Sequence, residues 1–442
     1  MQSRNALVSD IGTEQTFFEP EERPQLEDRW ELPAEGRPWK DIHSDLISRK
    51  SGDYNWRAGR VPLYIYYDND ELLSVARDAY NLFFTENSLG ARAFPSLQRM
   101  EKEIIQMCLS LFRAPNDADG SFTSGGTESL FLALKTAREF FLKTDASGIR
   151  TNIVIPRTAH PAMDKAAHYL GVDVRRIEVR SDLRVDTEAL ESAVDSRTIM
   201  ICGSAPCYPY GVYDSIGRLG EIALSKKVWL HVDACLGGFL GPFARDEGYP
   251  ITEFDFSIPG VRSLSADLHK FGFSAKGASV VLYRSAKLKR HQWFEFNNWP
   301  RGSYATETLL GSRPGGAVAS AWAVSQYLGV AGYRRLARKT MEAKTRLVNG
   351  IERIAELEVI RPSELNILLY RSVDRSVDIN AVAELLGQRG WFVGRSREPE
   401  ALHLALNTVH HPIIDEYLID LKNAVLEARA TGRTGARDDT TY

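Results

Sequence analysis

A lysine that directly follows a histidine is the first candidate for chemistry in this sequence. Lys270 lies in the segment SADLHKFGFSAKG, residues 265–277, between an expected strand and a glycine-containing turn. Because burial disfavours the charged form of an amine, a lysine in a partly apolar site is expected to lose proton affinity. A neutral amine can condense with an aldehyde to form a Schiff base. The alternative is that Lys270 and Lys276 are two surface lysines of a loop.

An aspartate at the end of an apolar stretch is the second candidate. Asp233 closes the run VWLHVD, residues 228–233. A carboxylate there is costly unless it meets a partner, and a protonated pyridine nitrogen would be one. A helix N-cap or a buried ion pair is the alternative. His160 follows the segment NIVIP; its imidazole could stack on a flat heteroaromatic ring, and a structural histidine is the alternative.

Two glycine-containing turns precede helical patterns and could bind phosphate. The first is TSGGTESLFLAL, in which residues 124–127 stand before an apolar-periodic helix. Free backbone N–H groups at a helix start bind phosphate, and glycines let it approach. A plain cap with Glu128 is the alternative. The second turn is GSRPGG, residues 311–316, for which an interdomain hinge loop is the alternative.

The order of these features is more specific than each feature alone. A phosphate turn, a histidine, a strand-end aspartate and a His-Lys pair together supply each protein contact that pyridoxal phosphate needs. That cofactor acts as an electron sink, while the protein supplies the lysine and an acid at the pyridine nitrogen. The nine histidines show no HxxxH or HxH spacing, so no metal site is expected.

Alternating helices and strands over residues 60–300 must position these side chains. Helices are predicted at 100–112, 128–143 and 160–171, and strands at 152–156, 198–205, 229–234 and 278–284. Gly171 suits a left-handed helix cap. Short apolar strands separated by helices indicate an α/β fold with a mostly parallel sheet covered on both faces.

A smaller C-terminal α+β unit is predicted after this region. Its elements are a helical stretch at 316–357, strands at 367–372 and 401–407, and helices at 379–390 and 411–428. We therefore predict four parts: an N-terminal arm (1–60), a large domain (61–315), a linking helix with a small domain (316–430) and a polar tail (431–442). The arm is expected to be irregular, because Pro20, Pro24, Pro33 and Pro38 interrupt any long helix.

Composition excludes several classes of protein. The chain has 442 residues, of which 43% are hydrophobic and 26% charged, so it is neither disordered nor of low complexity. A net charge of -3 gives no reason to expect nucleic-acid binding. The four cysteines form no CxxC pair and are expected to be buried thiols in a reducing compartment. With no signal peptide and no membrane span in the sequence, we expect a soluble, cytoplasmic protein.

The sequence resembles the sphingosine-1-phosphate lyases, within the group II pyridoxal-phosphate-dependent decarboxylases of fold type I. The matching segments are TSGGTES, AHPAMDKAAHYLG, CGSAPCYPYGVYDSI, LHVDACLGGFLGPF, SLSADLHKFGFSAKGASVVLYRS and GSRPGG, with looser matches in GRVPLYIYY and FPSLQRMEKEI. The likeness runs from about residue 28 to 425. It implies a large pyridoxal-phosphate-binding domain and a smaller C-terminal domain. Because the membrane anchor of the eukaryotic members is absent, the chain looks like a bacterial, soluble form.

The resemblance also implies a role for each matching residue. Lys270 would carry the cofactor, Asp233 would pair with its ring nitrogen, and His160 would stack on the ring. The cofactor phosphate would be contacted by Gly125, Gly126, Thr127 and His269, and by Gly311 and Ser312 of the neighbouring subunit, which makes a homodimer necessary. Around the substrate the resemblance places Tyr66, Tyr210, Lys276 and Asn87.

One departure from the family pattern concerns the substrate end. Gly90 stands where the family has a histidine, and Arg92 could replace its charge. The predicted reaction is retro-aldol cleavage of a phosphorylated long-chain amino alcohol into a fatty aldehyde and phosphoethanolamine, with Lys276, Tyr66 or a phosphate oxygen as the base. The alternatives are amino-acid decarboxylation on the same cofactor, and a homologue that binds the cofactor without turnover.

Overall fold

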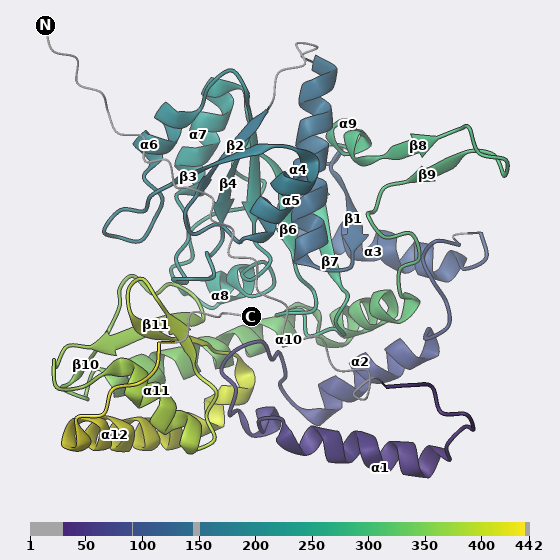
Figure 1. Ribbon diagram of the computed structural model, residues 1–442. Coiled ribbons are helices and arrows are strands. Elements are labelled where there is room, and N and C mark those ends of the chain that lie inside the picture. Colours follow the sequence, from purple (N-terminus) through teal and green to yellow (C-terminus); the bar gives the residue numbers. More distant parts are fainter. Residues whose placement is uncertain (1–29, 91, 145–150, 438–442) are drawn as a thin grey trace, which may run out of the picture. The chain divides into compact units, whose positions relative to one another are not determined.

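The structure is a computed structural model that describes residues 30–90, 92–144 and 151–437 (Figure 1). The chain forms two compact units, residues 1–53 and 54–442. In the first unit, helix α1 (Trp39–Arg49) begins directly after Pro38, and the 3₁₀ turn η2 (Lys50–Gly52) follows it. Because proline is tolerated at a helix start, this part of the expected arm is helical, not irregular throughout. Pro20 and Pro24 lie outside the described residues.

A seven-stranded sheet forms the centre of the second unit. Its strand order is β1-β7-β6-β5-β4-β2-β3. β7 runs antiparallel to both of its neighbours, and the other pairs are parallel, so the prediction of a mostly parallel sheet is confirmed. The strands are β1 (Asp119–Thr123), β2 (Asn152–Pro156), β3 (Asp173–Ile177), β4 (Thr198–Ser204), β5 (Trp229–Asp233), β6 (Val261–Ala266) and β7 (Ser279–Tyr283).

Both faces of this sheet are covered by helices. In β2, the side chain of Val154 belongs to one hydrophobic core, whereas Ile153 and Ile155 belong to another. Since successive side chains of a strand point to opposite faces, the two cores lie on the two sides of the sheet. Helices α4 (Gly126–Thr144) and α5 (Ala162–Leu170) contribute to one core, and α3 (Pro95–Leu111), α7 (Ile216–Lys226) and α8 (Gly241–Asp246) to the other.

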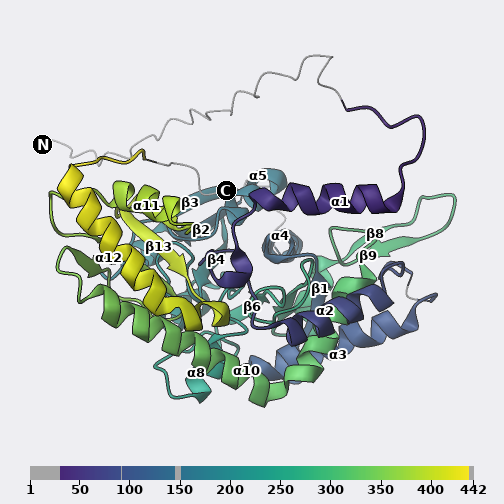
Figure 2. The ribbon, with the colours of Figure 1, turned by 90° about the horizontal axis from the view of Figure 1, so that it is seen from below.

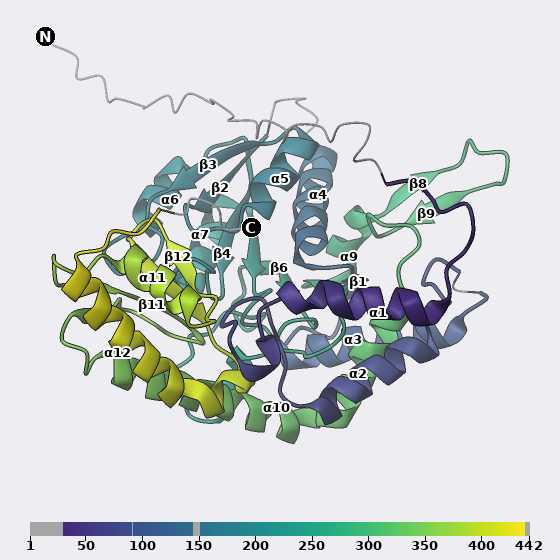
Figure 3. The same cartoon turned by 60° about the horizontal axis from the view of Figure 1, so that its bottom comes forward.

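A long helix leads from the large sheet to the C-terminal part. Helix α10 (Gly315–Ile351) consists of two helical segments separated at Gly329, whose φ of 52° and ψ of -174° are not helical. Figure 3 shows α2 (Asp70–Leu82) lying along the first segment. Figure 2 shows α12 (Ile414–Thr431) beside α10 near its other end. The predicted helical stretch at 316–357 is therefore present, but it contains a break.

A four-stranded antiparallel sheet organises the C-terminal part. Its order is β10-β11-β13-β12, and α11 and α12 pack with it in a separate hydrophobic core. Both predicted strands and both predicted helices are found here. The elements are β10 (Leu357–Val359), β11 (Ile367–Ser372), α11 (Ile379–Gln388), β12 (Gly394–Ser396), β13 (Ala401–Ala405) and η5 (Thr408–Ile413).

Shorter elements complete the second unit. They are η3 (Trp56–Ala58), α6 (Thr187–Ala193), α9 (Ala286–Lys289), η4 (Arg290–Gln292), β8 (Phe294–Phe296) and β9 (Tyr304–Thr306). β8 and β9 form a hairpin that projects from the large domain (Figure 1). Among the helices that the structure describes, none is long and apolar enough to span a membrane.

Candidate active site

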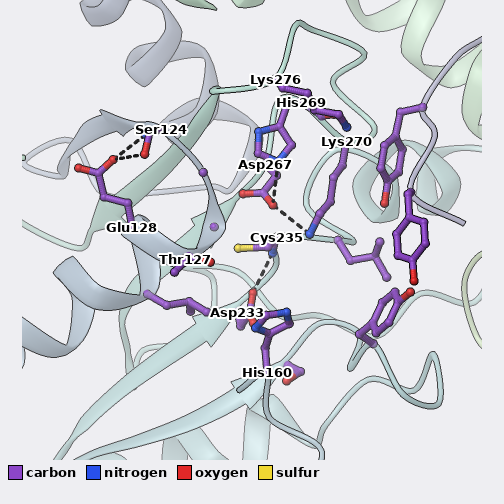
Figure 4. A pocket seen from close by; sticks show the side chains of 18 of the residues that line it. Ser124, Thr127, Glu128, His160, Asp233, Cys235, Asp267, His269, Lys270 and Lys276 are labelled. Atoms are coloured by element: carbon purple, nitrogen blue, oxygen red, sulfur yellow. Dashed lines mark hydrogen bonds and ion pairs between the residues drawn. The ribbon is translucent and has the colours of Figure 1, made fainter. Parts of the chain in front are cut away.

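A cavity of about 600 Å³ lies where several strands of the large sheet end (Figure 4). Ser204 ends β4, Asp233 ends β5, and Asp267 comes directly after β6; all three line the cavity. In register, Ser204 pairs with Asp233, and Asp233 with Ser265. In open α/β sheets, ligands bind outside the carboxyl ends of the strands. The topology therefore gathers these side chains at the usual binding edge.

Lys270 points into this cavity and forms an ion pair that the sequence analysis did not foresee. Its Nζ lies 2.9 Å from Oδ2 of Asp267 (Figure 4). Burial alone would lower the pKa of Lys270, but the charge of Asp267, helped by Tyr66, outweighs burial and raises that pKa. The expectation that Lys270 loses proton affinity is therefore wrong for the cofactor-free chain. The idea of two surface lysines does not hold for Lys270, whereas Lys276 lines the cavity and is exposed.

Asp267 is the main site residue that the sequence analysis missed. It is 2% exposed, and its Oδ1 has no hydrogen-bond partner among the described residues. Its other neighbour is His269, whose Nε2 lies 3.5 Å from Oδ2. Burial lowers the pKa of His269 to about 4, against the opposing effect of Asp267. The available signal was the position of an aspartate at a strand end, three residues before Lys270.

The turn before α4 forms a close-packed rim of the cavity. A Cβ on Gly126 would lie 2.9 Å from Sγ of Cys235 and 3.0 Å from Oδ2 of Asp267, so a side chain does not fit there. Ser124 donates from its backbone N–H and its hydroxyl to Oε2 of Glu128, each at 2.7 Å. The capping alternative is thus observed. The cap does not exclude a phosphate site, because Gly125, Gly126 and Thr127 still line the cavity.

Asp233 and His160 lie together at another side of the cavity (Figure 4). Oδ1 of Asp233 accepts a hydrogen bond from the backbone N–H of Cys235 at 3.0 Å. Nδ1 of His160 accepts one from the backbone N–H of Ala162 at 3.1 Å. Burial lowers the pKa of His160, so its ring is held neutral. A neutral imidazole beside a carboxylate suits a planar ring with a protonated nitrogen.

Lys276 differs from Lys270 in its surroundings. Its Nζ donates to the backbone carbonyl of His269 at 3.2 Å and lies 4.9 Å from the centre of the Tyr66 ring. Partial burial, together with the charge of Lys270, lowers the pKa of Lys276 to about 8. The Tyr66 ring packs edge-on against Phe271, with centroids 5.1 Å apart. The two amines of the cavity therefore differ: the pKa of Lys270 is raised, and that of Lys276 is lowered to about 8.

The remaining predicted residues do not line this cavity. The Tyr210 hydroxyl donates to the backbone carbonyl of Glu398 at 2.7 Å. Asn87 forms an isolated β-bridge with Pro314, on a segment apart from the cavity lining. The other three residues outside the lining are Gly311, Ser312 and Arg92. Their roles therefore stay predictions. Tyr64, Tyr208, Cys235 and Leu236 do line it; no motif singles them out.

The residues present fit pyridoxal phosphate. The cavity offers an amine on Lys270, a strand-end carboxylate on Asp233, and a helix start with closely packed glycines for a phosphate. The unpaired Oδ1 of Asp267 supplies a further polar atom. Within the described ranges, no group of three or more His, Cys, Asp or Glu residues is placed to hold a metal ion.

Fold and cavity together define a pyridoxal-phosphate enzyme of fold type I. The pyridoxal-dependent decarboxylase conserved domain matches residues 22–372, and the chain belongs to that family. It is 38% identical over 407 residues to a sphingosine-1-phosphate lyase of Arabidopsis thaliana, covering 90% of this chain and 74% of the relative. It is 35% identical over 360 residues to a probable L-tyrosine/L-aspartate decarboxylase of Methanothrix thermoacetophila, covering 81% and 89%.

Solved structures give the same fold. The sphingosine-1-phosphate lyase of Burkholderia pseudomallei superposes with a TM-score of 0.87 at 36% identity, covering 91% of this chain and 94% of the other. A glutamate decarboxylase of Lactobacillus brevis superposes with a TM-score of 0.80 at 20% identity, covering 91% and 95%. The predicted fold class, family and pyridoxal phosphate cofactor are confirmed.

Proposed function

We propose that this enzyme is a carbon–carbon lyase that cleaves a phosphorylated long-chain amino alcohol, similar to sphingosine 1-phosphate, into a fatty aldehyde and phosphoethanolamine. The observation that carries the proposal is the second amine of the cavity, Lys276, beside the amine that would hold the cofactor. Decarboxylation of an amino acid needs no partner for a phosphate and no base for a hydroxyl. The likeness to sphingosine-1-phosphate lyases over about nine-tenths of the chain supports the same conclusion.

The reaction requires two proton transfers and one bond cleavage. A base takes the proton of the hydroxyl at the carbon next to the amine-bearing carbon. The bond between these carbons breaks, the hydroxyl-bearing part leaves as an aldehyde, and the amine-bearing carbon receives a proton. When bound, pyridoxal phosphate supplies the electron sink for the bonding pair. General acid–base help in such transfers contributes about 10²–10⁴-fold.

We assign the first proton transfer to Lys276. A base is most effective when its pKa lies near the working pH, and the pKa of Lys276 is lowered to about 8. Lys270 is the amine assigned to the cofactor, so Lys276 is the second amine that the cavity offers for this role. The Tyr66 ring, 4.9 Å from Nζ of Lys276, orients that amine in the cavity.

We further propose that the active enzyme is a homodimer in which Gly311 and Ser312 reach the cofactor phosphate of the partner. Leu309 and Leu310, directly before them, are 56% and 41% exposed. Exposed apolar side chains of this size favour an interface. Their backbone N–H groups donate to Oε1 of Glu128 at 2.8 and 3.3 Å, which fixes this loop against the start of α4.

We also propose a cytoplasmic location. All four cysteines are buried and free, and a chain that pairs none of its thiols suits a reducing compartment. Burial alone raises the pKa of Cys108 to about 12, so this thiol is held unreactive.

Product analysis of the cofactor-loaded enzyme tests the lyase activity. We expect a long-chain 2-amino-3-hydroxyalkyl phosphate to release an aldehyde, and common amino acids to release no carbon dioxide. Carbon dioxide from an amino acid without aldehyde from the phosphate would establish the decarboxylase alternative, which Gly90 and the archaeal relative favour. A bound cofactor whose absorbance responds to no amine would instead indicate a homologue without turnover.

A further inference from the structure

Residues 60–67 carry a side chain of the candidate active site and are bonded to the C-terminal part of the chain. Tyr66 lines the cavity, and the centre of its ring lies 4.9 Å from Nζ of Lys276. We propose that Asn407 and Thr408 are positioning residues that set the place of the Tyr66 ring in the active site. The inference deepens the proposed function and rests on it, because Tyr66 is assigned there to orient the amine that acts as the base.

The backbone of residues 60–67 obtains hydrogen-bond partners from the C-terminal part of the chain. The Arg60 carbonyl accepts from the Phe392 N–H at 2.9 Å, the Val61 carbonyl from Nε2 of His410 at 3.1 Å, the Pro62 carbonyl from the Ala405 N–H at 2.7 Å, the Ile65 carbonyl from Nδ2 of Asn407, and the Tyr67 carbonyl from the Thr408 hydroxyl at 3.0 Å. Backbone groups that are removed from water require such partners. The C-terminal part therefore fixes this segment, as one strand of a sheet fixes its neighbour.

The backbone at Tyr64 is strained, and the strain explains why the segment needs this support. Tyr64 has a φ of 57°, in the left-handed region that a residue with a large side chain rarely adopts. The Ile65 N–H donates to the Leu63 carbonyl at 2.6 Å and so closes a γ-turn around Tyr64, which is a strained form when the central φ is positive. Such a conformation persists only where its surroundings hold it. The bonds from Ala405 and Asn407, on either side of the turn, supply that constraint.

Tyr66 lies between the two carbonyls that the proposed positioning residues bind. Asn407 donates to the carbonyl of Ile65, and Thr408 donates to the carbonyl of Tyr67. Loss of either bond frees the backbone directly beside Tyr66, and the ring then moves with it. A misplacement of about 1 Å, caused from outside the reacting groups, can lower a reaction rate by about 10²-fold. These two bonds are therefore expected to affect the reaction more than other bonds of the same kind.

The two donors are themselves held in place. Asn407 and Thr408 are 1% and 0% exposed. Oδ1 of Asn407 accepts from the Val409 N–H at 3.1 Å, and the Asn407 backbone N–H donates to Nδ1 of His410 at 2.9 Å. Burial lowers the pKa of His410 to about 4, so its neutral ring accepts at Nδ1 and donates at Nε2. Since Oδ1 of Asn407 is committed to the Val409 N–H, Nδ2 faces the Ile65 carbonyl.

Two substitutions remove these bonds with little change of shape. Asn407→Asp keeps an oxygen for the Val409 N–H, but it places a second oxygen where the amide donates to the Ile65 carbonyl. Thr408→Val replaces the hydroxyl that donates to the Tyr67 carbonyl by a methyl group.

Each of the two variants has a matched control away from residues 60–67. Asn380 is 7% exposed, and its Nδ2 donates to Oε1 of Glu400 at 2.9 Å, so Asn380→Asp makes the same replacement of a donor by an oxygen. Thr136 is 0% exposed, and its hydroxyl donates to the Leu132 carbonyl at 2.6 Å, so Thr136→Val loses the same kind of bond as Thr408→Val.

The first measurement is hydrogen exchange in the cofactor-loaded enzymes, read by mass analysis of the peptide that contains residues 60–67. Exchange reports how often a segment opens locally. We expect this peptide to exchange about tenfold faster in Asn407→Asp and in Thr408→Val, the scale for loss of one buried hydrogen bond. Both control variants should keep the wild-type rate in this peptide. Thermal unfolding and bound-cofactor absorbance verify that each variant is folded.

The second measurement is a double-mutant cycle on the rate of aldehyde release. We expect Asn407→Asp and Thr408→Val each to lower kcat/KM by about tenfold or more when Tyr66 is present. In the background of Tyr66→Ala, each should lower it by less than about twofold, because the bond then has no ring to place. Residues that act through one contact show such non-additivity. The control variants should leave kcat/KM within about twofold of the wild type.

The possible failures are distinguishable. If residues 60–67 exchange at the wild-type rate in both variants, the bonds do not hold the segment, and the inference fails whatever the activity. If the variants lower kcat/KM equally with and without Tyr66, or if Tyr66→Ala itself changes nothing, the inference fails while the proposed function stands. If the wild type releases no aldehyde, the proposed function fails, and the positioning role fails with it. If one variant does not fold, the other decides the outcome.

Discussion

The predicted site has two halves in different places. One half lies in the cofactor cavity, and the other lies where residues 86–88 run against residues 313–315. In the cavity, the side chains come from the ends of neighbouring strands of one sheet. In the second region, the Ser88 N–H donates to the Arg313 carbonyl at 3.0 Å, and the Gly315 N–H to the Glu86 carbonyl at 2.9 Å. Asn87, Gly311 and Ser312, three of the predicted residues that miss the cavity, therefore belong to one region, whereas Tyr210 lies elsewhere and bonds to the Glu398 carbonyl.

This difference shows how the two halves would work together. Asn87, predicted near the substrate, lies opposite Pro314, two residues beyond Ser312, which is predicted at the partner's phosphate. Arg313, between them, is 8% exposed and pairs with Glu101. A loop anchored by a buried arginine is held in place. We infer that one anchored element presents Asn87, Gly311 and Ser312 together to a second copy of the chain.

The largest effect is expected from a substitution in the cofactor cavity. Lys270→Ala removes the amine that would carry the cofactor, so we expect the bound-cofactor absorbance to disappear on dialysis and kcat to fall by at least about 10⁴-fold, the scale for removal of a covalent catalyst. Lys226→Ala, on the exposed side of α7, is the control and should change neither quantity. A coloured Lys270→Ala protein after dialysis would refute the assignment.

Lys276 should govern the pH dependence of activity. Its pKa is lowered to about 8, so below this pH the amine is charged and cannot accept a proton. We expect kcat/KM to rise with pH and to flatten above about 8. Lys276→Met should remove this rise and lower kcat/KM by about 10²-fold.

Activity that falls with rising pH would assign a different role to Lys276. If KM for the phosphorylated substrate increases above about pH 8, loss of the ammonium weakens binding, and Lys276 holds the substrate phosphate instead of acting as the base. The phosphorylated amino alcohol used for product analysis serves for this measurement.

A mixture of one inactive and one weakened variant tests whether the second region serves the partner. Ser312 is exposed in the chain, so Ser312→Trp should fold and should weaken activity by roughly tenfold or more through loss of the phosphate contact, about 1.4 kcal/mol. Mixed with Lys270→Ala under conditions that exchange subunits, it should regain activity, because one site then combines an intact Lys270 with an intact Ser312. If Ser312 acted within its own chain, no mixture would regain activity.

Part of the fold could be predicted because several strands contain short continuous runs of apolar residues. The strands at 152–156, 198–204 and 229–233 are buried along their whole or nearly whole length, and their sequences show it. A strand was expected before Lys270 but without bounds, because Ser263 and Ser265 interrupt the apolar pattern of β6. In the structure both serines are buried, and Ser263 accepts a hydrogen bond from the Trp229 indole at 2.7 Å. A partner on another strand makes such a residue acceptable in the core, and no local pattern reveals it.

β3 and the ion pair of Lys270 were missed for related reasons. β3 (DVRRI) is an edge strand, where charged residues are tolerated because one side remains open. At the site, partial burial of Lys270 was expected, but the direction of its pKa shift depends on Asp267. The loop after β6 brings Oδ2 of Asp267 to 2.9 Å from Nζ of Lys270. Residue types indicated that Lys270 belongs to the site, but only the fold shows that Asp267 meets it and at what distance.

The smallest effect is expected for the pKa values of the two lysines of this loop, Lys270 and Lys276. Asp267→Asn removes the negative charge that raises the pKa of Lys270, so burial is left to lower that pKa. In the cofactor-free protein, an amine-acylating reagent reacts only with the neutral amine, and peptide mass analysis gives the extent at each residue. In the wild type, Lys276 should react from about pH 8 and Lys270 only at higher pH. In Asp267→Asn, the reaction of Lys270 should move to lower pH, and that of Lys276, whose pKa the charge of Asp267 also raises, should move in the same direction. Lys226, exposed on α7, is the internal control. Equal profiles for Lys270 with and without Asp267 would show that the carboxylate does not hold the ammonium, and that burial alone sets the charge of this amine before the cofactor arrives.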